Sequence, residues 1–294
     1  MKKTIFLALS LTALLFTSCN NDEDNHEDMV ISGFSNAELS NFFGGGNGYY
    51  TYTTTSDRAI GQNYQNFHSH LSNFWGTNSA FSFVGNSTNI NYTNNAVAVT
   101  TGGKHYILVG NALVNKLLPS SKVSDFVDDA FVLAHEHGHI TQRYVGYYPN
   151  GNNTLGLELS SDMLAGYYLG RNNGGNANWT QAATAFKTAN SVGGGDHGSG
   201  SQRESAVRLG FVIAKNGSRA FSAKELMNAY ENLYSRILKG EKFDQNTKVN
   251  GREVNPYTIT GHSEEMSQDL KDILVREYDD LVKFNKESIE RYGE

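Results

Sequence analysis

Two histidines four residues apart, next to an apolar run, constrain this chain more than any other feature. Residues 130–134 read Ala-Phe-Val-Leu-Ala, and His135, Glu136 and His139 follow in the H-E-x-x-H spacing. Successive residues of an α-helix turn by about 100°, so the two imidazoles lie within roughly 40° of each other and can grip one metal ion. The fold must therefore bring a further ligand to this face of the helix.

Glu136 lies on the same side of the predicted helix and is the expected general base. Its carboxylate would border the open metal position, where it can take a proton from a zinc-bound water whose pKa falls from about 16 to about 7. His137 lies about 200° around the helix from His135, so it points away from the metal. We interpret His137 as a packing histidine.

The expected third ligand is Glu158, nineteen residues after His139, in an apolar segment with helical spacing. Asp162 lies one turn further on the same face and can accept the free ring N–H of a ligand histidine, which fixes the tautomer of that ring. The metzincin pattern would instead place a glycine and a third histidine where this chain has Gln142 and Val145. That class of peptidase is excluded.

Three blocks of this sequence resemble the neutral zinc metallopeptidases of bacteria and, more distantly, the CAAX-prenyl-protease-like zinc peptidases. The third block is similar to the His-Gly-x-x-x-Gln-Arg element of that family, and the blocks cover residues 132–142, 158–167 and 197–203. With the strand region before the metal helix, the resemblance extends over roughly residues 70–212, and it departs at Ser161 and Met163. It implies an α+β, zincin-like catalytic domain with a small sheet and one Zn²⁺ per chain.

His197 and Arg203, in the third block, each have two interpretations. A histidine or arginine near the scissile carbonyl could stabilise the oxyanion of the tetrahedral intermediate, which is worth about 2.7 to 4 kcal/mol per donor. Alternatively, His197 is an exposed loop histidine, and Arg203 forms a salt bridge with Asp162 or caps a helix. We predict that His197 is catalytic together with Glu136, and leave the role of Arg203 open.

The N-terminus has the pattern of an exported lipoprotein. Met1-Lys2-Lys3 precedes an apolar run over residues 5–16, which is shorter than the roughly 20 residues of a membrane span. Residues 1–18 are therefore a predicted signal peptide. Cys19, the only cysteine of the chain, ends a sequence that resembles a relaxed lipobox, so we expect it to be lipidated. The alternative is a plain secretory signal with an accidental cysteine.

Residues 19–30 are the predicted tether between lipid and enzyme. Residues 20–28 of this segment are polar and acidic, with no apolar residue, and cannot bury apolar surface. Acidic stretches at this place resemble the surface-export signals of some Gram-negative lineages. We therefore expect an outer-membrane lipoprotein of the cell envelope, exposed on the cell surface and attached to the membrane through Cys19.

The remaining chain is long enough for a sizeable core, and we divide it at residue 216, where it becomes helical and charged. Residues 31–216 form the predicted metallopeptidase domain and residues 217–294 a helical C-terminal extension. The net charge of −6, with no basic patch interleaved with aromatic residues, argues against nucleic acid as a partner. The oligomeric state stays open.

Hydrophobic periodicity predicts the main elements. We expect strands at 80–84, 96–100 and 105–109, and helices over 60–74, near 124–145, around Glu158, and at 179–190 and 201–215. A capping box at Ser222–Glu225 opens a helix to about residue 238. A last helix, from 263 to about 291, carries an apolar stripe that packs onto the catalytic domain or, alternatively, binds a partner or a second copy.

These observations predict a surface-anchored zinc peptidase that cleaves a peptide or protein substrate. The alternative is a non-catalytic surface lipoprotein, a scaffold or nutrient-capture module that retains the same fold. Glu136 discriminates between them, because a structural zinc site does not need a carboxylate at that position and closes its fourth position with a protein ligand.

Overall fold

A computed structural model of the chain places most of the predicted elements. It describes residues 49–50, 55–84, 95–101, 103–110, 112–114, 127–147, 154–191, 197–234, 248–249, 252–253 and 266–292. The predicted signal peptide, Cys19 and the acidic tether lie outside the described residues. Among the residues that the structure describes, no helix combines the length and apolar character needed to span a bilayer.

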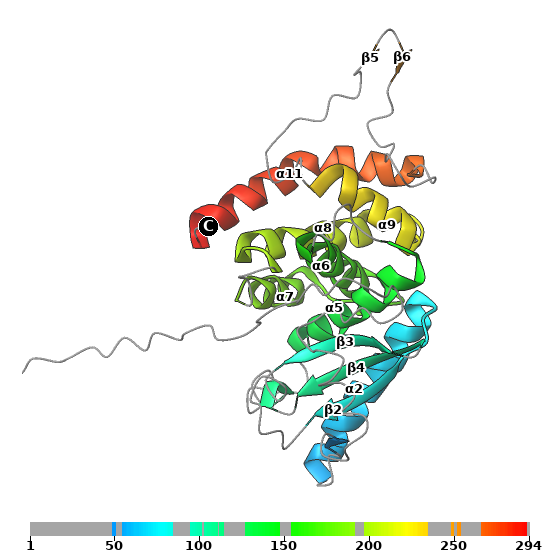
Figure 1. Cartoon of the computed structure of the whole chain (residues 1–294). Coiled ribbons are helices and arrows are strands. Elements are labelled where there is room, and N and C mark those ends of the chain that lie inside the picture. The colour runs from blue at the N-terminus through cyan, green and yellow to red at the C-terminus, as the bar shows by residue number, and fades with distance from the viewer. Residues whose placement is uncertain are drawn as a thin grey trace, which may run out of the picture.

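A small mixed sheet lies at one end of the molecule (Figure 1). Its strand order is β1-β2-β4-β3, with β2 parallel to β4 and the other neighbours antiparallel. The hairpin of β3 and β4 turns at Gly103, whose φ of 71° favours glycine. The strands are β1 (Tyr49–Tyr50), β2 (Ala80–Val84), β3 (Ala96–Thr101) and β4 (Lys104–Gly110), which confirms the three predicted strands.

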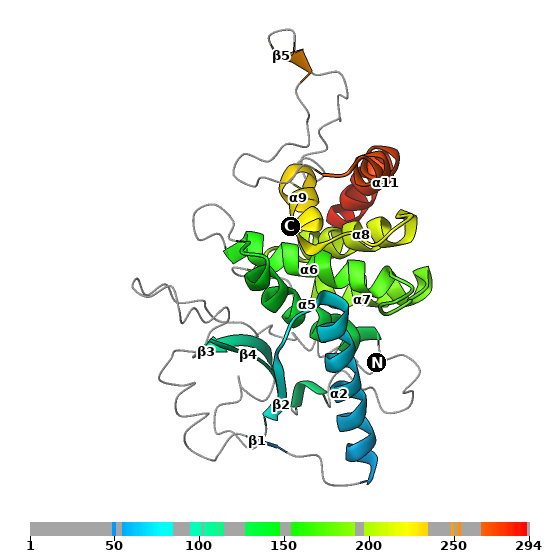
Figure 2. The ribbon, with the colours of Figure 1, turned by 90° about the vertical axis from the view of Figure 1, so that its right-hand side faces the viewer.

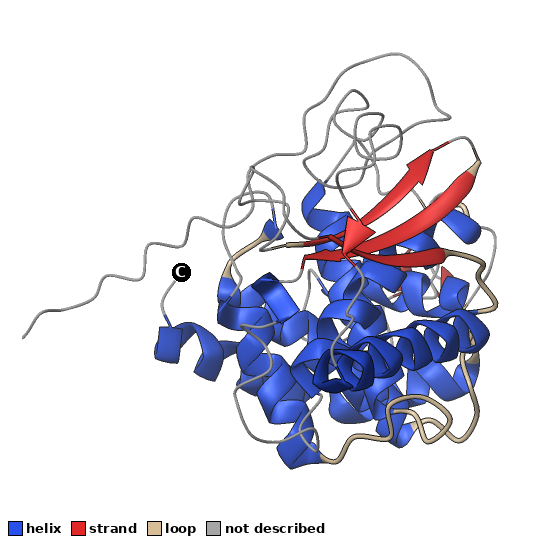
Figure 3. Cartoon of the chain, turned by 90° about the horizontal axis from the view of Figure 1, so that it is seen from below, coloured by secondary structure: helices blue, strands red, loops and turns tan. Residues whose placement is uncertain are grey.

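Helices stack on one side of this sheet, as the view in Figure 3 shows. Helix α5 packs on β3 and β4, α6 packs on α5, and α8 packs on α6, with α2 and α7 against α5. The molecule is therefore α+β, as predicted. The helices are α2 (Thr55–Trp75), α5 (Val127–Tyr144), α6 (Thr154–Gly170), α7 (Trp179–Ser191) and α8 (Gly200–Asn216), close to the predicted ranges.

Small residues let α6 approach both of its neighbours closely. A Cβ atom on Gly138 of α5 would lie 2.2 Å from Ser161 Oγ, and one on Gly210 of α8 would lie 1.8 Å from the Met163 carbonyl oxygen. The Ser161 hydroxyl also donates to the His135 carbonyl oxygen. Helix α6, which carries Glu158 and Asp162, is thus held between the H-E-x-x-H helix and α8.

The C-terminal helices complete the stack. The Ser222–Glu225 capping box is present at the start of α9 (Ala223–Ala229), which continues as the π-helix η3 (Tyr230–Tyr234); the rest of that predicted helix lies outside the described residues. Helix α11 (Gln268–Tyr292) buries its apolar stripe against α8, as we expected. Short strands β5 (Lys248–Val249) and β6 (Arg252–Glu253) pair with each other in the segment between these helices.

Two hydrophobic clusters hold these layers together. One joins the sheet to α2, α5 and α7, and the other joins α6 and α8 to α9, η3 and α11. Side chains of α6 and α8 belong to both clusters, so these two helices form the centre of the molecule (Figure 2). The metal-ligand candidates lie on α5 and α6, next to this centre.

Candidate metal centre

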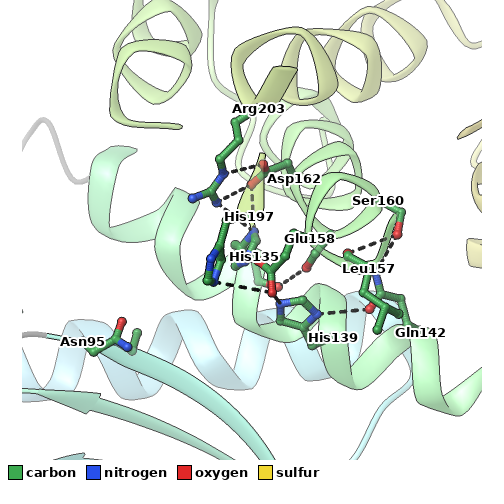
Figure 4. Close-up of polar contacts among 12 residues, drawn as sticks. Asn95, His135, His139, Gln142, Leu157, Glu158, Ser160, Asp162, His197 and Arg203 are labelled. Carbon is green, nitrogen blue, oxygen red and sulfur yellow. Dashed lines mark hydrogen bonds and ion pairs between the residues drawn. The ribbon is translucent and has the colours of Figure 1, made fainter. Parts of the chain in front are cut away.

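Helices α5 and α6 bring the three predicted ligands together in the interior. His135 Nε2 lies 3.1 Å from Glu158 Oε2, and His139 Nε2 lies 3.5 Å from Glu158 Oε1. The ligand atoms of all three residues lie within 4.8 Å of one another, and each residue is buried. His135, His139 and Glu158 can therefore hold one metal ion, as their spacing predicted (Figure 4).

Asp162 orients the ring of His135. Its Oδ1 lies 2.8 Å from His135 Nδ1, and because an ionised carboxylate only accepts, Nδ1 carries the proton. The lone pair of His135 is then on Nε2, which faces Glu158. This contact is the one expected of Asp162.

Gln142 orients the ring of His139, a role that we had not predicted. Its amide nitrogen donates to the Leu157 carbonyl oxygen and to Ser160 Oγ, both at 2.7 Å. Its Oε1 is thereby turned toward His139 Nδ1, at 3.1 Å, and accepts from it. The signal was its position three residues after His139 on the same helix, which places the two side chains next to each other.

Arg203 pairs with Asp162, which is the second of its two interpretations. Its Nε donates to Asp162 Oδ2 at 2.8 Å and its Nη2 to Oδ1 at 2.9 Å. Arg203 is 3% exposed and Asp162 is fully buried. These two hydrogen bonds from the guanidinium compensate the negative charge of Asp162, which would otherwise be isolated in the interior.

The buried carboxylates make the ligand pocket favourable for positive charge. Burial alone would lower the pKa of His135, but Asp162 and Glu158 outweigh it and raise the pKa to about 10. Burial would raise the pKa of Glu158, yet His139 and His135 hold it well below its usual range. The two carboxylates therefore stabilise positive charge at the ligand nitrogens.

Glu136 lies beside the ligands without taking part in their contacts. It is 7% exposed, and burial raises the pKa of its carboxyl against the opposing effects of His135 and His139. Among the described residues, no side chain forms a hydrogen bond with its carboxylate. The carboxylate is therefore not engaged by another side chain and can accept a proton.

His197 reaches the same group of side chains from the segment before α8. Its Nε2 lies 3.7 Å from Glu158 Oε1, and its side chain is 13% exposed. Burial lowers the pKa of His197, with an opposing contribution from Glu158. The exposed-loop interpretation therefore does not describe this histidine, since its ring is mostly buried at the ligand carboxylate.

His137 points away from the ligands, as expected. It is fully buried on the opposite side of α5, with its ring centroid 5.0 Å from that of His68. Neither ring nitrogen of His137 has a hydrogen-bond partner in the described structure. Burial lowers the pKa of His137 well below its usual value and that of His68 to about 4, so both rings are neutral.

Comparison with protein-family models, curated proteins and solved structures finds no match. The likeness to the neutral zinc metallopeptidases therefore stays a prediction from three blocks of sequence.

The types of ligand atom indicate which metal ions suit this site. Two imidazole nitrogens and one carboxylate oxygen suit Zn²⁺ and neighbouring first-row ions, and do not suit Mg²⁺ or Ca²⁺, which prefer oxygen ligands alone. The cluster of potential ligands in the described part of the chain has three members, His135, His139 and Glu158. Three protein ligands leave a coordination position open, which is the arrangement of catalytic rather than structural zinc sites.

Proposed function

We propose that this protein is a zinc-dependent peptidase with a zincin-like catalytic domain, one Zn²⁺ per chain, and a peptide or protein as its substrate. The observation that supports this most is the position of Glu136, a buried carboxylate beside three ligand side chains and outside their hydrogen bonds. A site that only stores or binds metal does not need this carboxylate.

In this proposal each side chain of the site has a defined role. Bound Zn²⁺ supplies Lewis acidity, which polarises a carbonyl group and acidifies water. Glu136 accepts the proton of the attacking water and returns it to the leaving amine. Asp162 and Gln142 hold both ligand imidazoles with Nε2 toward the metal. His197, whose Nε2 lies 3.7 Å from Glu158 Oε1, would donate a hydrogen bond to the oxyanion.

We also propose that the protein is located in the cell envelope. The signal peptide over residues 1–18 and lipidation at Cys19 would place the catalytic domain outside the cytoplasm, on an acidic tether at the outer membrane. A surface-exposed position would give the site access to extracellular peptides.

Glu136→Gln tests the catalytic role, because it keeps the size of the side chain and removes the base. We expect the variant to bind zinc like the wild type, to melt close to it, and to cleave casein at least about a hundredfold more slowly. Chelation should abolish cleavage by the wild type, and added zinc should restore it.

The matched control is Glu158→Gln, the same substitution at a ligand, which should lose both metal and activity. If the wild type shows no chelator-sensitive hydrolysis of any peptide pool, or if Glu136→Gln is as active as the wild type, the non-catalytic lipoprotein takes the place of the peptidase.

A further inference from the structure

Three consecutive residues of α8 contact two different helices, so α8 connects the metal centre with the C-terminal helix α11. Arg203 reaches toward α6 and holds Asp162. Glu204 and Ser205 follow at about 100° per residue and face α11. Helix α8 thus lies between α6 and α11, as Figures 1 and 2 both show.

The contacts between α8 and α11 at this point are polar and buried. Ser288 Oγ donates to Glu204 Oε2, and Ser205 Oγ donates to Asn285 Oδ1 at 2.9 Å. Glu204, Ser205, Asn285 and Ser288 are each at most 3% exposed. At the edge of this cluster, Arg291 Nη1 lies 3.8 Å from Glu204 Oε1.

Buried polar contacts of this kind determine register more sharply than apolar packing does. Apolar side chains tolerate small shifts, whereas a buried donor or acceptor that loses its partner is left unsatisfied in the interior, which destabilises the fold. A displacement of α8 relative to α11 would therefore distort the contacts of both Glu204 and Ser205. Arg203 lies on the same helix, so its contacts with Asp162 depend on the same placement of α8.

From this arrangement we infer that α11 is a positioning element of the metal centre. Asn285 and Ser288 hold α8 in the register in which Arg203 reaches Asp162, and Asp162 in turn holds the ligand His135. The inference rests on the metal centre of the proposed function and does not depend on peptidase activity.

The experiment measures the affinity of the folded protein for Zn²⁺ by competition with a chromogenic chelator, at a temperature where every variant is folded. The variant Asn285→Ala/Ser288→Ala should bind zinc about tenfold more weakly. This is the lower end of the effect expected when residues that hold metal ligands in place are replaced. Arg203→Ala should weaken binding by about 10- to 100-fold.

Combining the two sets of substitutions tests the route of the effect. If α11 acts through Arg203, Asn285→Ala/Ser288→Ala should change the zinc affinity little further when Arg203 is already alanine. The matched control is Ile273→Ala, a cavity at a buried position on the same helix. It should lower the melting temperature at least as much and leave the zinc affinity unchanged.

Three results would overturn the inference: an unchanged affinity in the α11 variant, additive effects with Arg203→Ala, or an equal loss of affinity in Ile273→Ala. A wild type that binds no zinc would overturn the metal centre as well. A wild type that binds zinc but cleaves no peptide would overturn only the proposed function.

Discussion

Buried polar side chains in this protein differ in whether they have hydrogen-bonding or ionic partners. Asp162 and Glu158 are buried carboxylates with strong partners, while His137 is a buried imidazole whose ring nitrogens have no hydrogen-bond partner in the described structure. Two predictions at the scale of single residues follow from this difference and from the surroundings of Asp129.

Glu158→Ala and His137→Leu should differ in metal content. Glu158 is predicted to bind the ion, so its loss should leave purified protein with much less than one zinc per chain after dialysis. His137→Leu should keep the metal and melt at or above the wild-type temperature, because an unpaired buried polar group costs about 1–3 kcal/mol. Elemental analysis and thermal melts check both variants, and equal metal loss would contradict the ligand assignment.

Asp129 should make stability depend on pH. It is 1% exposed, accepts a hydrogen bond from Tyr64, and burial raises the pKa of its carboxyl from 3.8 to about 6. Because its pKa is raised, the carboxyl of Asp129 binds a proton more tightly in the folded than in the unfolded state, so protonation stabilises the fold. This stabilisation is complete below pH 3.8 and is lost as pH rises through about 6. The difference is on the order of 3 kcal/mol.

Asp129→Asn removes the charge and keeps an acceptor for Tyr64. Relative to the wild type, the free energy of unfolding of this variant in urea should rise between pH 4.5 and pH 8. A wild-type-to-variant difference that stays constant over that range would show that Asp129 does not titrate in this way.

At the scale of elements, the position of α6 depends on glycines in the two neighbouring helices, α5 and α8. Gly210 of α8 meets the Met163 carbonyl oxygen, and Gly138 of α5 meets Ser161, so α6 lies closer to both neighbours than larger residues would allow. The close approach brings Glu158 to the histidines of α5 and Asp162 to Arg203 of α8.

Gly210→Ala should therefore destabilise the protein. The added Cβ would lie 1.8 Å from a backbone oxygen, which cannot move without moving the helix. We expect the free energy of unfolding to fall by about 1–3 kcal/mol or more, despite the better helix propensity of alanine. Thr184→Ala, at an exposed position of α7, is the control and should stay within about 0.5 kcal/mol of the wild type. A stabilised Gly210→Ala would mean that α6 and α8 lie further apart.

At the scale of the whole molecule, the C-terminal helices share one hydrophobic cluster with the helices of the metal centre. Leu159 and Met163 of α6 belong to the same cluster as Leu226 of α9 and Leu270 of α11. Buried side chains on both sides of the predicted division at residue 216 thus belong to one cluster, and α11 has both a packing role and the proposed positioning role.

Cys19→Ser tests the anchoring of the whole molecule. A lipidated N-terminus is the membrane attachment that the sequence predicts, so the variant should leave the membrane fraction and appear in the soluble fraction. Cell fractionation with a known lipoprotein as a marker checks this. Unchanged membrane retention would contradict the lipobox interpretation.

The sequence by itself determined the elements and the ligand set, because both depend on local spacing. Two histidines four apart share a helix face in any helix, and periodicity predicted α5, α8 and the three main strands close to their observed bounds. It also predicted a helix around Glu158, where α6 lies. Glu158 was identifiable since a carboxylate in a second apolar helix suits the open side of the two imidazoles.

Only the tertiary structure decided the contacts between elements. The salt bridge of Arg203 with Asp162 spans 41 residues, and the contact of Ser288 with Glu204 spans 84. Gln142 was in the expected helix, but the direction of its amide depends on Leu157 and Ser160 of another helix. Spacing predicts which side chains share a face, whereas the partner of that face depends on how the helices pack, and here glycines and buried polar pairs determine that packing.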